Sequence, residues 1–201
     1  MFINKDYETL PLDSLVSSFN GLWTGKKPPF VEANVIRNTN FTMDGKLDLT
    51  DIAKLNVEEK MLNVKRLQMG DIIIEKSGGS QTQAVGRVVI FDIETDEVFS
   101  FSNFTSCLRI KSREILPVYL HAFLNYFYQQ GKTFEYQSGM TQLKNLDLKR
   151  YLKIDIKIPP IEVQKEYCSY TKLIDKLRFE AEEKKKELLA EKETLFDKYF
   201  R

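Results

Sequence analysis

The side chains that could catalyse a reaction are few in this chain of 201 residues. The single histidine, His121, lies in an apolar stretch, and the two cysteines, Cys107 and Cys168, stand in unrelated contexts. A zinc site needs about four His, Cys or carboxylate ligands at characteristic spacings. The sequence therefore predicts a packed histidine and two reduced thiols, with no metal centre and no cofactor.

Acidic residues near a lysine are the next candidates, because metal-dependent nucleases use carboxylates and a lysine to bind magnesium and polarise water. Asp71 and Glu75 come close to such a pattern, but Lys76 directly follows Glu75, so a strand places these two side chains on opposite faces. Residues 58–60 have the acid-x-Lys spacing but fall in a stretch predicted to be helical. Residues 78–80 are glycine-rich but lack the lysine of a phosphate-binding loop. We expect a chain that catalyses nothing by itself; an enzyme with another kind of site is the alternative.

The overall charge gives no sign of a broad nucleic-acid-binding surface. Lys and Arg number 30 against 29 Asp and Glu, a net charge of +1, so any basic surface must be local. The N-terminus lacks the apolar core of a signal peptide, and no run of about eighteen apolar residues could span a membrane. We expect a soluble, cytoplasmic protein.

Two regions differ sharply in composition. Residues 1–160 hold all six prolines and all nine glycines, whereas residues 161–201 hold none and are rich in Glu, Lys, Leu and Ala. The first region predicts a compact α+β domain of mixed helices and strands, and the second predicts one long helix.

Short β-branched and aromatic runs predict the strands of the first region. They cover residues 71–75, 85–91, 98–101, 105–110 and 152–158. Helices are predicted at Leu55–Asn63 and at Pro117–Gln130. The last strand alternates apolar and charged residues strictly, so we expect it to have one buried face.

The long helix carries a coiled-coil pattern in which apolar residues recur at heptad positions. The seam consists of Tyr167, Tyr170, Ile174, Leu177, Ala181, Leu188 and Leu195. Lys184 and Glu191 interrupt it. A helix of about forty residues is roughly 60 Å long at 1.5 Å per residue, and the preceding domain is too small to cover that length. We expect a partner helix; packing on the chain's own domain is the alternative.

Four stretches, in order, resemble the specificity subunits of type I restriction–modification systems. They are residues 11–15 with 21–23 and 35–40, residues 67–80 with 85–87, residues 139–146, and residues 156–164. Each motif alone is weak, but the four follow the family's order over nearly the whole chain. The family has two target recognition domains and two long antiparallel helices, and this chain has one of each. The resemblance therefore implies a half-size form.

The resemblance implies that residues 1–160 are a target recognition domain for double-stranded DNA. Such a domain needs polar side chains that bind base edges and cations that bind phosphates. Three polar segments have this character: Lys26, Lys27, Arg37, Asn38 and Asn40; Lys76, Ser77, Ser80, Gln81, Thr82, Gln83 and Arg87; and Thr141, Gln142 and Lys144. Ordinary solvated loops are the alternative interpretation. We expect Trp23 and Phe30 to pack against the core rather than to stack on nucleic acid.

By the same resemblance, the helix of residues 161–201 binds methyltransferase (modification) subunits, and a separate restriction subunit cuts DNA. Two copies paired antiparallel as a homodimer would read a palindromic bipartite site. The end at Leu195–Arg201 favours this dimer, although the chain is alternatively the first half of a longer one. A second hypothesis is an antirestriction mimic that sequesters methyltransferase subunits without reading DNA.

Overall fold

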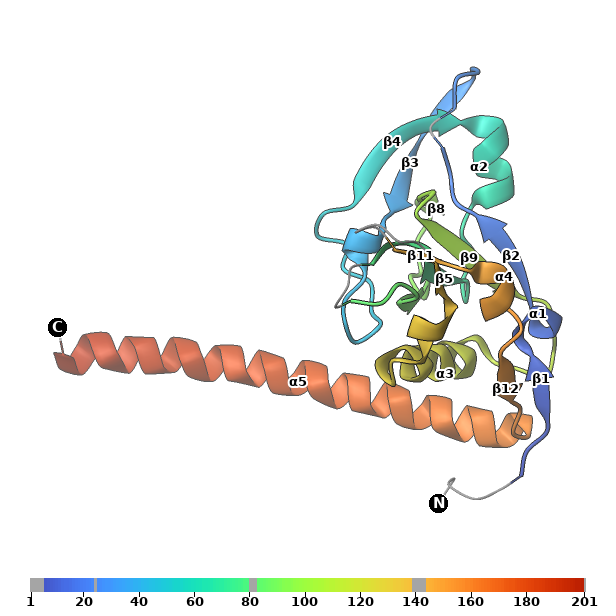
Figure 1. The fold of residues 1–201 in the computed structure, drawn as a ribbon. Coiled ribbons are helices and arrows are strands. Elements are labelled where there is room, and N and C mark those ends of the chain that lie inside the picture. The colour runs from blue at the N-terminus through green and yellow to red at the C-terminus, as the bar shows by residue number, and fades with distance from the viewer. Residues whose placement is uncertain (1–5, 24, 80–82, 139–143, 201) are drawn as a thin grey trace. The chain divides into compact units, whose positions relative to one another are not determined.

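The computed structural model describes residues 6–23, 25–79, 83–138 and 144–200 (Figure 1). The chain divides into two compact units, Met1–Ile161 and Glu162–Arg201. The first is a mixed α/β domain, and the second belongs to one long C-terminal helix. The predicted fold class is therefore confirmed.

The largest sheet has four antiparallel strands in the order β2-β9-β5-β7. Their bounds are Val16–Asn20 for β2, Thr105–Ile110 for β9, Ile72–Glu75 for β5 and Val88–Ile90 for β7. Ile72 and Ile74 lie in one core cluster and Ile73 in another, because alternate side chains of a strand point to opposite faces. Strand β5 is thus buried on both faces, which explains its unbroken apolar run.

Helix α3 (Pro117–Gln129) covers one face of this sheet. Leu120 and Leu124 are fully buried in the same cluster as Ile72 and Ile74. Pro117 occupies the first turn, where an N–H has no partner within the helix. The sequence predicted a helix at Pro117–Gln130, and the prediction is confirmed except that the helix ends one residue earlier, at Gln129.

A second sheet has the strand order β4-β3-β8, in which β3 pairs antiparallel with β4 and parallel with β8. Its strands are β3 (Phe30–Ile36), β4 (Ala53–Glu58) and β8 (Phe99–Phe101), and helix α2 (Glu59–Lys65) follows β4. The helix predicted from Leu55 is wrong in its first half. Val57 is fully buried and lies opposite Val31, so pairing with β3 overrides the local helical preference.

Short elements complete the domain around these sheets. They are β1 (Thr9–Pro11), α1 (Leu12–Leu15), the 3-10 helices η1 (Asn38–Asn40) and η2 (Lys132–Tyr136), α4 (Leu148–Tyr151) and β12 (Asp155–Lys157). Strand β12 pairs with β1. In β12, Ile156 is buried whereas Asp155 and Lys157 are exposed, so the predicted one-sided burial is confirmed.

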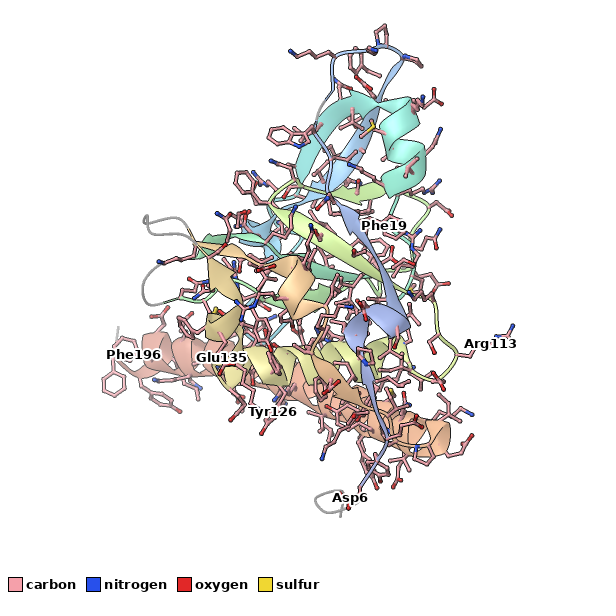
Figure 2. All side chains as sticks on the ribbon, turned by 45° about the vertical axis from the view of Figure 1, so that its right-hand side comes forward. Asp6, Phe19, Arg113, Tyr126, Glu135 and Phe196 are labelled. Atoms are coloured by element: carbon pink, nitrogen blue, oxygen red, sulfur yellow. The ribbon has the colours of Figure 1, made fainter. Side chains whose placement is uncertain are left out.

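Helix α5 (Ile161–Phe200) forms where the sequence predicts it. All side chains from residue 172 to residue 200 are exposed, and Figure 2 shows them projecting outward, with Phe196 labelled. Charged pairs one turn apart, such as Lys186 with Glu183, line its surface. Among the described residues, no helix is long and apolar enough to cross a membrane.

Candidate DNA-binding face

A small sheet brings two of the three predicted DNA-contacting segments together. Its strands, in the order β10-β11-β6, are β10 (Gln137–Ser138), β11 (Lys144–Leu146) and β6 (Ser77–Gly79). Across β6 and β11, Lys144 lies opposite Gly79 and Asn145 lies opposite Ser77. The Ser77 hydroxyl donates to Oδ1 of Asn145 at 2.5 Å. Residues almost seventy positions apart in the sequence therefore meet at one edge of the domain.

A buried ion pair lies directly behind this sheet. Arg87 donates from Nε to Oε2 of Glu75 at 3.0 Å and from Nη2 to Oε1 at 2.9 Å. Glu75 is 1% exposed, and its hydrogen bonds raise the pKa of Arg87 above the ordinary value. Two-point contact between a guanidinium and a carboxylate fixes both side chains in one orientation.

The same ion pair connects the third segment to the other two. Arg87 also donates to the carbonyl oxygens of Phe41 at 2.9 Å and Asn38 at 3.0 Å. The Asn38 amide in turn donates to Oε1 of Glu75 at 3.3 Å and to the carbonyl oxygen of Ser77 at 3.2 Å. Parts of all three predicted segments therefore converge on one polar network.

The backbone of β6 requires glycine beside this network. Gly78 has a φ of +126°, which L side chains rarely adopt, and a Cβ there would lie 2.5 Å from Nδ2 of Asn38. Gly78 thus allows the Asn38 amide to approach the strand.

The predicted DNA contacts Arg87 and Asn40 have roles inside the fold, and we do not retain them. All the hydrogen bonds of Arg87 described above go to protein acceptors. Asn40 is 2% exposed and donates to the carbonyl oxygens of Asp48 at 3.0 Å and Asp51 at 3.1 Å. Arg37 is more accessible, but its Nη2 binds the Asp51 carboxylate at 3.2 Å.

Lysines of the predicted segments lie outside this network, and Lys26 and Lys27 precede β3, at the end of the strand away from Asn38. Lys26 and Lys27 are exposed, and their backbone N–H groups donate to Oε1 of Glu58 at 2.5 Å and 2.6 Å. These bonds hold the pKa of Glu58 below its usual value and fix the backbone that carries both lysines. Lys76 donates to Oδ1 of Asn20 at 2.8 Å, and burial lowers its pKa.

Five predicted contacts lie outside the described residues: Ser80, Gln81, Thr82, Thr141 and Gln142. Gln83, by contrast, is described and lies directly before the buried Ala84.

The sequence predicted the wrong environment for Trp23 and Phe30 and did not indicate the roles of two polar residues. Trp23 is 70% exposed and Phe30 is 45% exposed, so the expectation that both pack against the core is wrong. Asn20 and Asn145, which bind Lys76 and Ser77, were not predicted as site residues. The available signal for Trp23 was its position between Gly21 and Gly25.

The residues considered for catalysis are in structural roles. Asp71 is 2% exposed and forms a two-point ion pair with Arg109, with a shortest distance of 2.7 Å. Burial lowers the pKa of His121 and raises that of Cys107. Within the described ranges, no cluster of three or more His, Cys, Asp or Glu residues could hold a metal ion.

Comparisons with known proteins identify the family and the fold of the chain. The family model described as "Type I restriction modification DNA specificity domain" matches residues 4–191. A solved structure from work on "complex assembly and conformational transition of the type I R-M system" is 17% identical, with a TM-score of 0.61 over 97% of this chain and 45% of the other. The HsdS subunit from Thermoanaerobacter tengcongensis is 15% identical, with a TM-score of 0.53 over 88% of this chain and 39% of the other.

At these identities the structural likeness shows a common fold. The chain spans less than half the length of either solved relative. A comparison with curated proteins finds no match.

Proposed function

The chain belongs to the family of type I restriction–modification DNA specificity domains, and from this premise we propose that its first 160 residues recognise one half of a bipartite site in double-stranded DNA. The observation that carries the proposal is the convergence of the three polar segments on the Glu75–Arg87–Asn38 network. A rigid support of this kind is what direct readout of base edges requires. The chain itself performs recognition and leaves catalysis to its partners.

The proposed contacts are of two kinds. Lys26 and Lys27 bind phosphates, because their ammonium groups are exposed while their backbone is held by Glu58. Strands β6 and β11 and the segments next to them in the sequence enter a groove and read bases. They contain nine of the predicted contacts: Lys76, Ser77, Ser80, Gln81, Thr82, Gln83, Thr141, Gln142 and Lys144.

We further propose a homodimer through antiparallel α5 helices. Ile174, Leu177, Leu188 and Leu195 are each about half exposed, so a seam of apolar side chains faces solvent. A parallel pair in register would place Lys184 against Lys184 and Glu191 against Glu191 of the second copy, with like charges in the seam. An antiparallel pair separates these like charges and sets the two recognition domains at opposite ends of the spacer.

The partners follow from the family. The helices bind methyltransferase subunits, which methylate the site, and a restriction subunit joins this assembly in the cytoplasm to cut unmodified DNA. Two identical domains related by a two-fold axis would read a palindromic site whose halves are separated by about one helical turn, roughly 34 Å.

Selection from a random duplex library tests the proposal. The purified chain, alone and with its methyltransferase subunit, is expected to enrich one sequence with two inverted halves. Binding is expected to weaken steeply with salt. Enrichment of no sequence under both conditions would contradict DNA recognition, and enrichment of a single unrepeated half would contradict the symmetric dimer.

The phosphate contacts have their own test. Replacing Lys26 and Lys27 with alanine should reduce the slope of log K against log salt by about 2, since each phosphate contact contributes about 0.9. The control is Lys157→Ala, another exposed lysine, on β12 near the opposite end of the domain (Figure 1). An equal decrease in the slope for both variants would show that the lysines act through the overall charge and not through direct phosphate contacts.

A further inference from the structure

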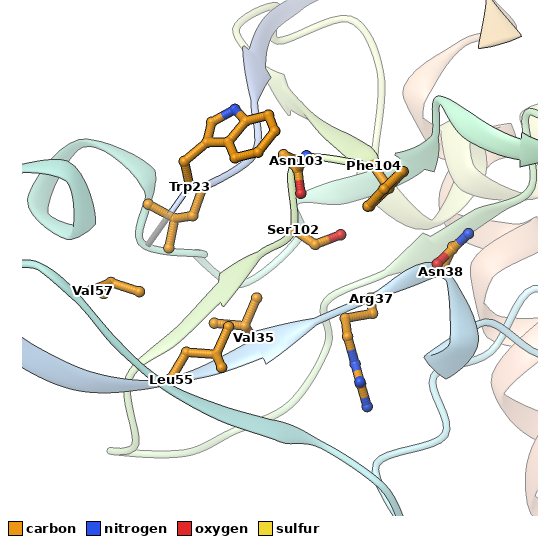
Figure 3. Close-up of a pocket in the computed structure, with 10 residues that line it drawn as sticks. Trp23, Val35, Arg37, Asn38, Leu55, Val57, Ser102, Asn103 and Phe104 are labelled. Carbon is orange, nitrogen blue, oxygen red and sulfur yellow. The ribbon is translucent and has the colours of Figure 1, made fainter. Parts of the chain in front are cut away.

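An apolar pocket of about 330 Å³ opens beside the DNA-binding face (Figure 3). Val35 of β3 and Leu55 and Val57 of β4 line its lower side, and Trp23 and Phe104 lie above them. The turn between β8 and β9 contributes Ser102 and Asn103. The pocket belongs entirely to the recognition domain.

The two aromatic side chains at this pocket are unusually accessible. Trp23 is 70% exposed and Phe104 is 46% exposed, although each could bury a large apolar area elsewhere. Leu55 is also exposed, at 37%. An occupant with flat apolar faces would remove this surface from water.

Two residues that line the pocket each carry a buried polar atom without a hydrogen-bond partner among the described residues. Ser102 is 9% exposed, and its hydroxyl oxygen is buried without a hydrogen-bond partner among the described residues. Arg37 also lines the pocket, and its Nε is likewise buried without a hydrogen-bond partner among the described residues. A serine hydroxyl both donates and accepts, so an occupant with a polar edge would satisfy it.

The pocket is continuous with the proposed DNA-binding face. Asn38 lines the pocket and donates to Glu75 and Ser77 in the polar network. The carbonyl oxygen of Phe104 accepts the N–H groups of Lys76 at 2.8 Å and Ser77 at 3.1 Å. A group that leaves the bound duplex could therefore enter the pocket without crossing the domain.

We propose that this pocket receives a single nucleobase that has left the stack of the bound DNA. Its flat faces would contact Trp23 and Phe104, and its polar edge would bind Ser102. A nucleobase combines two apolar faces with a hydrogen-bonding edge, which is what the lining offers. This inference rests on the proposed function, because it requires that the face beside the pocket binds DNA.

Trp23 provides the measurement, because it is the only tryptophan in the chain. Two duplexes of one sequence serve as probes at low salt. One carries a single thymine opposite an abasic site, and the other carries abasic sites on both strands at that position. Both are equally interrupted, so they differ only in the base available to the pocket. We expect at least fivefold tighter binding of the thymine duplex and at least twofold stronger quenching of Trp23 emission.

Two variants localise the effect, with binding followed by the anisotropy of a labelled duplex. Trp23→Ala, at an exposed position, and Phe104→Ala should each abolish the fivefold preference. Phe134→Ala is the matched control, because Phe134 is also 46% exposed but does not line the pocket. It should keep the preference.

Equal binding of the two duplexes would overturn the inference, as would a preference that survives both pocket variants. Quenching of Trp23 by a methyltransferase subunit without DNA, together with equal duplex binding, would assign the pocket to a protein side chain and overturn it as well. In each case salt-dependent duplex binding would persist. Failure of the proposed function differs, because no duplex would then be bound.

Discussion

The recognition domain and helix α5 place their ion pairs in opposite environments. In the domain, the Arg87 and Glu75 side chains are 13% and 1% exposed. Along α5, the Lys186 and Glu183 side chains are 72% and 49% exposed. A buried pair fixes a unique arrangement because breaking it leaves an unsolvated charge, whereas an exposed pair is replaced by water at little cost. The domain therefore holds its proposed binding face by internal contacts, whereas the apolar side chains of the helix are exposed to solvent.

The largest effect is expected when one partner of the buried ion pair is removed. Arg87→Ala should destabilise the domain by about 3–5 kcal/mol, because the Glu75 carboxylate is left buried without its cation. Chemical denaturation measures the loss. Lys186→Ala, which removes an exposed cation of α5, should leave the transition unchanged.

The double variant Glu75→Gln with Arg87→Met distinguishes charge burial from lost packing. It should recover part of the stability, because no uncompensated charge remains. A stable Arg87→Ala variant, or a double variant less stable than the single one, would contradict the role assigned to the pair.

The next largest effect concerns the helix. Leu188→Glu should weaken dimerisation at least tenfold, since burying a leucine contributes about 1.5–3 kcal/mol and each dimer contains two copies. Sedimentation equilibrium measures the change, and the expected starting mass is about twice 23.5 kDa. The stability of the recognition domain should not change.

Phe179→Glu is the matched control for the seam. Phe179 is 68% exposed and apolar, but it lies outside the heptad positions. Equal dissociation by both variants would exclude the predicted seam, and a wild-type chain that is monomeric at high concentration would exclude the self-dimer.

A smaller effect should follow from pH. Burial lowers the pKa of His121 in the folded domain below its ordinary value of 6.5, so the unfolded chain binds the proton more readily. Stability should therefore fall as the pH drops through 6.5, by at most about 1.4 kcal/mol per pH unit.

Thermal unfolding between pH 7.5 and pH 5.5 measures this loss, and His121→Asn should flatten the profile. Dimerisation through α5 should stay constant over this range, because the helix contains no histidine. A dimer that dissociates in step with His121 protonation would show that the two regions are coupled.

The spacing of apolar residues and the positions of Gly and Pro predicted several helices and strands correctly. Strand β5 contains the apolar run Ile72–Ile74 because both of its faces are covered, and β12 alternates because only one of its faces is covered. Helix α3 begins at Pro117, and α5 contains no Gly or Pro. In the two strands the sequence period matches the faces that the core covers.

The elements that the sequence did not predict correctly depend on partners far away in the chain. Residues 55–58 have helical character locally, yet they pair with β3, more than twenty positions earlier. The short strands β6 and β11 have almost no apolar signal and depend on their pairing partners: β6 pairs with β11, and β11 also pairs with β10.

For the candidate site, the amino-acid sequence determined which side chains are available: the polar segments around Arg37, Ser77 and Lys144, and the apolar seam of the long helix. Residue type and spacing are local properties, so they can be read without coordinates. The use of each side chain depends on contacts that form only in the folded chain. The tertiary structure directed Arg87 and Asn40 inward and left Trp23 exposed beside a pocket. The physical reason is that the burial of a polar group depends on the partners that folding brings to it, and here those partners come from segments far apart in the chain.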